Sequence, residues 1–345
     1  MSKVLLLPNE ESPSLWGIEL EAQNPMENAS GQFTSSGAKS WVTKNAPAFK
    51  KELEDYEVEN GSASTSDAWS QVDGDNIPAA YEESVESDLN DALDHNTVMS
   101  VHSDGGGLEV AFMPASFKYI RKDGSPYKKA IAIFNKYKFI GDDSTMAGMH
   151  IHFDRSLFTA DQFELFIIFL RENKVFLHTL SNRRERSSYT NVDTNVGKTN
   201  AGFTVSTAAE WKGHFDRKSA MYGNNCITLN PNGKGTVECR FFNSTLIEAK
   251  FFSNIELIHA LVYFIKSKRE KSLPEFFKYV LEYHKKYTNL ITNDLIPMKF
   301  ISKLEYGFKG KGNTEEESSR PSRTIGRRNI DGRRRYGHRR LSLQA

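Results

Sequence analysis

The sequence predicts an α+β protein whose sheet has one apolar face and one face rich in possible ligands. Several short stretches alternate apolar and polar residues with period two, which is typical of strands with one buried face. Four longer stretches carry apolar side chains at helical spacing, and the chain has no internal repeat. With 345 residues and 38% hydrophobic content, it is long enough for one large domain or two ordinary ones.

The strand predicted over Gly148–Asp154 is central to the functional interpretation. Its apolar residues alternate with His150, His152 and Asp154, so both imidazoles and the carboxylate share one face. Paired imidazoles suit a divalent metal, or phosphate oxygens beside one. Taken alone, the His-x-His pattern favours the alternative, an edge strand with a solvated polar face. Acids on neighbouring strands are therefore needed to decide, and Asp154, at the strand's end, is expected to be structural.

Two earlier regions supply such acids. The strand predicted over residues 14–21 places Glu19 and Glu21 on one side and apolar residues on the other. Residues 97–114 predict a strand, a three-glycine loop and a second strand in which Glu109 is flanked by apolar residues. A carboxylate embedded in such a strand is costly unless it is paired or bound to a metal.

A later hairpin is predicted from strands at residues 217–230 and 235–244. Its second strand carries Glu238 and Arg240 two residues apart, so the acid and the base share a face. This strand is expected to be central in the sheet, which is a poor place for unpaired charge.

The helices are recognised by apolar stripes and by their start signals. Proline near the N-terminus marks two of them, and the capping box Thr159-Ala-Asp-Gln162 starts a third. The predicted helices cover residues 125–139, 159–180, 245–271 and 273–293.

An acidic insertion is predicted at about residues 22–95. Between residues 51 and 95 there are fourteen acids and one lysine, in a partly helical or irregular pattern. Three roles are open: a solvated cover, a repulsive gate, or a docking surface for the basic end of the chain.

The C-terminal residues 311–345 are predicted to form a flexible, arginine-rich tail. From residue 320 onward there are nine arginines and one acid, a charge of +8, so the remainder of the chain carries +1 − 8 = −7. Such a tail suggests contact with nucleic acid or another anionic surface, although a disordered solubilising tail has the same composition.

A cytoplasmic location is expected from the cysteine content and the apolar runs. There are two cysteines, which do not form a disulfide framework. If the hairpin turns between Asn232 and Gly233, Cys226 lies opposite Cys239 and the two are reduced neighbours. No apolar run is long enough for a membrane span or a signal peptide, so no membrane association is expected.

Five motifs occur in an order that resembles a known family. They are Gly17–Glu21, His102-Ser-Asp-Gly with Leu108-Glu-Val, Gly148–His152, Tyr222 with Leu229-Asn230, and Thr236–Arg240. This order resembles the amidoligase family of bacteria and phages, which is similar to glutamine synthetase and glutamate–cysteine ligase. The resemblance covers roughly residues 14–265. It implies a glutamine synthetase-like catalytic fold over residues 1–310, a curved antiparallel β-sheet with helices packed on its outer face.

The resemblance also implies an ATP- and Mg²⁺-dependent carboxylate–amine ligase that works through an acyl phosphate. The chain would then be a phage or bacterial member, acting in the host cytosol if phage-encoded. His152 would lie near the ATP phosphates. The implied metal ligands are Glu19, Glu21, Glu109, His150 and Glu238.

The remaining roles concern the substrates. Arg240 would stabilise the phosphoryl group in transfer, and Arg184 or Arg186 would contact the substrate carboxylate. Asp104 and Asn230 would shape the cofactor site by contacting the metal ligands and not the metal itself. The acid and amine substrates are left open among amino acids, peptides, cell-wall fragments, modified nucleotides and protein side chains.

Two other function classes are compatible with the sequence. One is a nucleic-acid- or virion-associated binding protein that retains the ligase scaffold and uses the arginine tail. The other is a metal-dependent hydrolase that needs no nucleotide. The Glu-x-Arg strand favours the ligase over the hydrolase, because an arginine beside the metals suits phosphoryl transfer.

Overall fold

The computed structural model describes residues 4–6, 14–26, 33–61, 64, 67–104, 106–141, 147–182, 227–229 and 235–301. All of them belong to one structural unit, residues 1–302, and the predicted arginine tail lies outside them. Within these residues no helix combines the length and apolar character needed to cross a bilayer.

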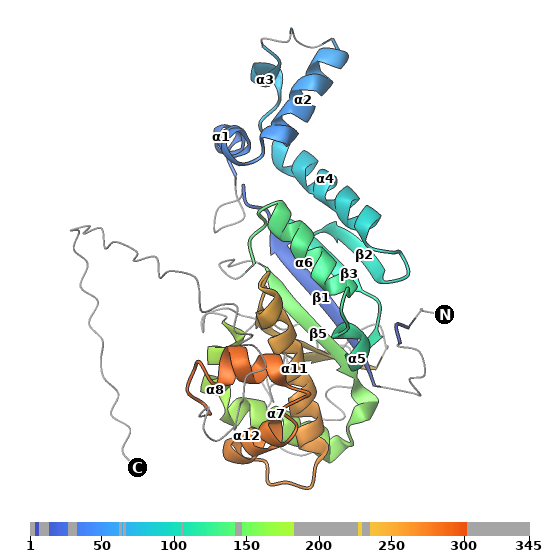
Figure 1. The fold of residues 1–345 in the computed structure, drawn as a ribbon, viewed down its shortest axis with the longest axis vertical. Helices are drawn as coiled ribbons and strands as arrows, with labels where there is room; N and C mark the ends of the chain where they lie inside the picture. The colour runs from blue at the N-terminus through green and yellow to red at the C-terminus, as the bar shows by residue number, and fades with distance from the viewer. Residues whose placement is uncertain are drawn as a thin grey trace, which may run out of the picture. The chain divides into compact units, whose positions relative to one another are not determined.

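The strands form one open antiparallel sheet (Figure 1), which confirms the α+β class. The strand order is β2-β3-β1-β5-β7-β6, with the short β4 pairing with β1. β1 and β5, which carry three of the predicted metal ligands and His152, are therefore adjacent at the centre of the sheet. The strands are β1 Leu15–Gln23, β2 Val98–Ser103, β3 Gly107–Phe112, β4 Ala115–Ser116, β5 Gly148–Asp154, β6 Ile227–Leu229 and β7 Thr236–Asn243.

Helices are found at all four predicted positions, and the acidic insertion is helical as well. The described helices are α1 Ser35–Asn45, α2 Pro47–Glu59, α3 Ala68–Gln71, α4 Ile77–Ala92, α5 Phe117–Ile120, α6 Pro126–Lys136, α7 Ala160–Glu172, α8 Lys174–Ser181, α11 Glu248–Lys266 and α12 Leu273–Glu282. A 3₁₀ turn, η1 Arg155–Leu157, follows β5, and a π-helical turn, η3 Leu290–Leu295, follows α12.

The helix predicted over residues 159–180 is interrupted. The capping box is present, because Thr159 Oγ1 accepts from Gln162 N at 3.2 Å and Gln162 Oε1 accepts from Thr159 N at 3.1 Å. At Asn173, however, the backbone leaves the helical region (φ −107°, ψ 29°), and its side chain donates to Phe169 O at 2.8 Å. This local hydrogen bond competes with the helix and separates α7 from α8.

The helix predicted over residues 273–293 is also divided, for a reason that lies far away in the sequence. α12 ends at Glu282, and η3 begins only at Leu290. The buried carboxylate of Glu256 on α11 accepts from Leu290 N and from Asn289 Nδ2, each at 2.9 Å. These bonds satisfy donors at the start of η3 and attach it to α11, so tertiary contact overrides the apolar pattern.

One face of the sheet packs against the helices and forms the core. On β1, Trp16, Ile18 and Leu20 are at most 1% exposed. Phe112 of β3 packs against Tyr127 of α6, with ring centroids 4.3 Å apart. Figure 1 shows α6 and α11 on this side of the sheet. Because side chains alternate along each strand, the opposite face carries the polar residues.

The acidic insertion joins the sheet through α4. Tyr81 of α4 donates its hydroxyl to Tyr137 O at 2.9 Å, and its ring stacks near Phe139 at 6.2 Å between centroids. α1, α2 and α3 continue beyond the end of the sheet (Figure 1). The insertion is therefore a helical subdomain anchored by an aromatic cluster.

The predicted pairing of the two cysteines is wrong by one residue. Ile227 of β6, and not Cys226, lies opposite Cys239 of β7. Alternation alone does not determine where a hairpin turns, and a shift of one residue changes every pair along it.

We expect the buried Glu256 to matter for stability. It also pairs with Arg121, whose Nε lies 3.2 Å from Glu256 Oε1. Removing it leaves the donors at the start of η3 and a guanidinium without their acceptor, which costs about 3–5 kcal/mol. Glu256→Ala should lower the free energy of unfolding by that amount in urea titrations. Glu248→Ala, which removes an exposed partner of Lys128 on the same helix, should cost less than about 1 kcal/mol. Equal losses would contradict this role.

Candidate metal centre

Cross-strand pairing brings the first group of polar residues together. β1 and β5 pair so that Glu19 lies opposite His150 and Gly17 lies opposite His152. β5 and β7 pair so that His152 also lies opposite Glu238. Residues directly opposite one another on the same face have Cβ atoms about 5 Å apart, so their side chains meet.

A second group lies further along β1. Glu21 pairs with Glu109 of β3, and Glu109 pairs in turn with His102 of β2. The His102 Nε2 atom lies 3.6 Å from Glu109 Oε1. Asp104 follows β2 in the tight turn to β3, where Gly106 adopts φ +105°, a conformation that favours glycine. The turn places Asp104 beside these acids.

Arg240 lies at an irregularity of the sheet. The register between β5 and β7 shifts between Met149 and Ile151, so β7 carries one extra residue at this point. Arg240 lies in the shifted stretch and donates Nη1 to Glu238 Oε1 at 2.9 Å. Bulges redirect side chains and are frequent beside functional sites. The predicted pairing of an acid and a base on β7 is therefore present.

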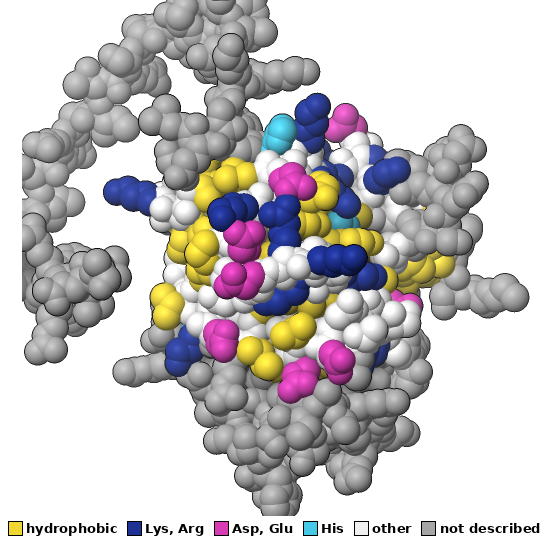
Figure 2. Space-filling view, turned by 90° about the horizontal axis from the view of Figure 1, so that it is seen from below, with side chains coloured by type: hydrophobic (Ala, Val, Ile, Leu, Met, Phe, Trp, Pro, Cys, Tyr) yellow, Lys and Arg dark blue, Asp and Glu magenta, His cyan; other side chains and the backbone are white. Residues whose placement is uncertain are grey.

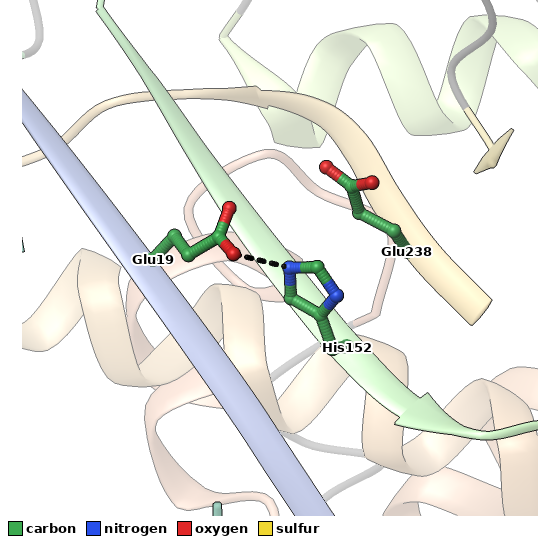
Figure 3. Close-up of side chains that lie close together, drawn as sticks. All are labelled: Glu19, His152 and Glu238. Carbon is green, nitrogen blue, oxygen red and sulfur yellow. Dashed lines mark ion pairs between the residues drawn. The ribbon is translucent and has the colours of Figure 1, made fainter. Parts of the chain in front are cut away.

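Glu19 lies between the two imidazoles. Its Oε2 atom is 3.0 Å from His150 Nδ1, and its Oε1 atom is 3.1 Å from His152 Nε2 (Figure 3). Burial alone would raise the pKa of Glu19, but the contacts with both histidines outweigh it and lower the pKa well below the ordinary value. Burial lowers the pKa of His152, whereas Glu19 raises it, and the net direction is upward.

His150 connects the two groups. It is 3% exposed, and its Nε2 atom lies 3.3 Å from Glu21 Oε1. Its Nδ1 atom also lies 3.6 Å from Glu238 Oε1. The carboxylate of Glu21 accepts the backbone N–H of Gly148 as well, which fixes its orientation at the start of β5.

The donor set fits a hard divalent cation. Among the residues that the structure describes, three combinations bring ligand atoms within 4.8 Å of one another: Glu19 with His152 and Glu238, Glu19 with Glu109 and His150, and Glu21 with Asp104 and Glu109. Carboxylate oxygens with a single imidazole nitrogen suit Mg²⁺ or Mn²⁺. Because the first and third combinations share no residue, the face offers separate ligands for two ions.

Glu109 has a strongly raised pKa, because it is buried and lies beside other acids. Burial, followed by the charges of Glu19 and Glu21, raises its pKa to about 7. Near neutral pH a proton on Glu109 therefore relieves repulsion between the acids, and a bound cation would do the same.

A cavity of about 340 Å³ adjoins Glu19 and His152. Gly17 lines it, and a Cβ atom at that position would lie 3.2 Å from His152 Cβ, so the glycine leaves space beside the imidazole. The rest of the lining is mainly apolar and includes Met99 and Pro114. A flat or apolar group could therefore lie next to the first ligand group.

The structure brings together most of the predicted site. The residues that converge on one face are Glu19, Glu21, Asp104, Glu109, His150, His152, Glu238 and Arg240. Arg184, Arg186 and Asn230 lie outside the described residues. Asp104, predicted to lie behind the ligands, is close enough to be a ligand itself. Asp154 has the expected structural role, because its Oδ1 accepts from Ser156 N at 2.7 Å.

The sequence interpretation missed two contributors. His102 was not assigned a role, although a hairpin centred on the glycine loop places it opposite Glu109. Gly17 was likewise unassigned. Its signal was its place on the same strand face as Glu19, where a missing side chain leaves space.

No protein-family model matches the chain, and a search of curated proteins found no match.

The raised pKa of Glu109 predicts a pH dependence of stability in the metal-free protein. Between its ordinary value of 4.5 and about 7, the folded state keeps a proton that the unfolded state releases. The stability that Glu109 contributes is thus present below pH 4.5 and lost as the pH rises through 7. Relative to Glu109→Gln, the wild type should lose about 3 kcal/mol of unfolding free energy between pH 4.5 and 8. Urea titrations in EDTA at several pH values measure the unfolding free energy of both proteins. If the free energies of wild type and Glu109→Gln change with pH in parallel, the prediction is contradicted.

Proposed function

We propose that this chain is an ATP- and Mg²⁺-dependent carboxylate–amine ligase with a glutamine synthetase-like catalytic fold, related to the amidoligase family. The observation that supports it best is the convergence of acids, imidazoles and Arg240 on one sheet face. Four strands contribute to that face. The two-cysteine composition fits a reducing compartment, so we place the activity in the cytoplasm, that of a bacterial host if the chain is phage-encoded.

The chain's own residues would divide the work between two ligand groups. Glu19 and Glu238 would bind an ion on the side of the cavity, and Glu21 and Glu109 would bind another on the opposite side, with His150 between them. Bound Mg²⁺ would neutralise phosphate charge during transfer. His152 is oriented by Glu19, so its imidazole can donate to a phosphate oxygen at the edge of the cavity.

Arg240 would stabilise charge on the phosphoryl group in transfer. Its side chain is 31% exposed and is oriented by the hydrogen bond to Glu238. A guanidinium held beside a ligand carboxylate is preorganised and does not have to be recruited during the reaction. We assign the nucleotide to the adjoining cavity, because it borders Glu19 and His152, beside the first ligand group.

The proposed reaction has two balanced steps. In the first step, a substrate carboxylate oxygen attacks the terminal phosphorus of ATP, and the bond from that phosphorus to the bridging oxygen breaks. The products are an acyl phosphate and ADP, which is the leaving group. The amine nitrogen then attacks the acyl carbon, phosphate leaves with the carbon–oxygen bonding pair, and the nitrogen loses one proton. Amino acids, peptides and cell-wall fragments are the substrate classes to test.

The ligase makes a specific prediction for nucleotide binding. Calorimetry should detect ATP binding with Mg²⁺ and little or none with EDTA. Glu238→Ala should weaken binding at least about ten-fold, because it removes a ligand and the partner of Arg240. Glu172→Gln, which changes an exposed acid on α7, should bind as the wild type does. Metal-independent binding, or an unchanged Glu238→Ala variant, would contradict the proposal.

Activity separates the ligase from the hydrolase. ADP release should require Mg²⁺ together with an acid and an amine, drawn from a panel of amino acids, peptides and cell-wall fragments. Arg240→Lys should lower kcat about 100-fold or more with a smaller change in KM, because a lysine ammonium cannot present the planar, multiply donating guanidinium to the phosphoryl oxygens. Amide hydrolysis without nucleotide would favour the hydrolase.

A second candidate is binding of nucleic acid through the C-terminal region. The observation that favours it is the +8 charge of residues 320–345. On the face of the described residues seen in Figure 2, by contrast, basic and acidic side chains are interspersed. On α12, Glu275 lies near both Arg269 and Lys278. We therefore assign this candidate function to the tail.

Binding through the tail should depend steeply on salt. Fluorescence anisotropy with a labelled duplex should show an affinity that falls with rising salt and is lost on deleting residues 320–345. Metal-dependent ATP binding should survive the deletion, because no proposed ligand lies in the tail. An affinity that is insensitive to salt would exclude this function.

A further inference from the structure

The acidic insertion contacts the loop that carries Asp104. Ser103 Oγ donates a hydrogen bond to Glu82 Oε2 of α4 at 2.9 Å, and Asn24 Nδ2 donates to Glu82 Oε1 at 3.0 Å. Ser103 is the last residue of β2 and immediately precedes Asp104, and Asn24 directly follows β1. One carboxylate thus joins the insertion to the ends of two strands that carry or border the candidate ligands.

Asn24 extends this connection to the β2–β3 turn. It is 0% exposed, and its Nδ2 donates to Pro78 O at 3.2 Å as well as to Glu82. Its Oδ1 accepts from Met26 N at 3.0 Å, and its own N–H donates to Gly106 O at 3.0 Å. Every polar group of this buried amide is engaged, so losing one partner carries the cost of an unsatisfied buried donor.

One backbone hydrogen bond joins the ends of β2 and β3 at the turn. Asp104 N donates to Gly107 O at 2.9 Å, which is the backbone bond that closes it. Gly106 is in the left-handed region of φ, and glycine has the largest conformational freedom of any residue. The contacts with Ser103 and with Gly106 from outside the hairpin therefore restrict where Asp104 can lie.

We propose that Glu82 is a positioning residue for the metal group formed by Glu21, Asp104 and Glu109. It acts through Ser103 and Asn24, which place the Asp104 carboxylate beside the other two. This inference rests on the proposed metal-dependent function, and it gives the insertion a part in the site. Residues that orient metal ligands typically change metal affinity 10–100-fold when removed.

The experiment is a Mn²⁺ titration of the full-length protein followed by electron paramagnetic resonance of free Mn²⁺. Glu82→Ala should weaken one class of sites about ten-fold or more and leave the class that depends on Glu238 unchanged. Glu82→Gln should recover most of the affinity, because an amide still accepts from Asn24 and can donate to the Ser103 hydroxyl. Glu83→Ala is the matched control, since it removes an exposed charge at the next position of α4.

A second measurement does not depend on metal. In EDTA, amide hydrogen exchange of Asn24 and Asp104 should accelerate in Glu82→Ala and not in Glu83→Ala, because their acceptors are Gly106 O and Gly107 O of the turn. Unchanged exchange would overturn the positioning role whatever the metal result.

The outcomes separate the two proposals. A wild type that binds no Mn²⁺ would contradict the metal-dependent function. If the wild type binds Mn²⁺ and Glu82→Ala binds it with the same affinity, only the role of Glu82 is overturned. If Glu82→Gln were as weak as Glu82→Ala, or if Glu83→Ala were equally weak, lost charge and not loop position would be the cause, and the inference would fail.

Discussion

The contact of Glu19 with two imidazoles is the interaction on which the site depends, and the strand register determines it. Glu19 can lie opposite His150 only while Trp16, Ile18 and Leu20 face the helices. A slip of one residue between β1 and β5 would place those apolar side chains on the polar face and bury the acids in the core. Hydrophobic burial on one side of the sheet thus sets the position of the ligands on the other.

The same contact explains how the protein tolerates so many acids in one place. Glu19 is compensated by histidines on β5, Glu238 by Arg240, and Glu109 by a raised pKa that keeps it protonated up to about 7. These three acids are thus each compensated by a neighbour or by a proton. A divalent cation would have to displace these partners, so binding releases protons and depends on pH.

The faces of the strands could be predicted because their two sides differ chemically. Alternation was sufficient to place Glu19 with Glu21 and His150 with His152, and the outcome agrees for each pair. The extra residue of β7 at Arg240 was not predicted, although it shifts the alternation by one residue, so that two apolar residues, Phe241 and Phe242, follow one another. The break before η3 was missed since it depends on Glu256, more than thirty residues earlier in the chain. The predicted pairing of Cys226 with Cys239 was wrong, because the alternating pattern does not fix the residue at which the hairpin turns.

The acidic insertion shows why composition alone did not define a role. Its charge suggested a cover, a gate or a docking surface, all of which treat the acids as equivalent. The structure distinguishes them: Lys51 pairs with Asp55 on the solvent side of α2, whereas Glu82 accepts from a fully buried asparagine at the end of β1. The insertion starts after β1 and ends before β2, so its last helix must pass the turn that carries Asp104. The order of the elements along the chain therefore brings α4 to this turn. The contact between them needs one hydrogen-bonding side chain, that of Glu82, and does not need an acidic surface.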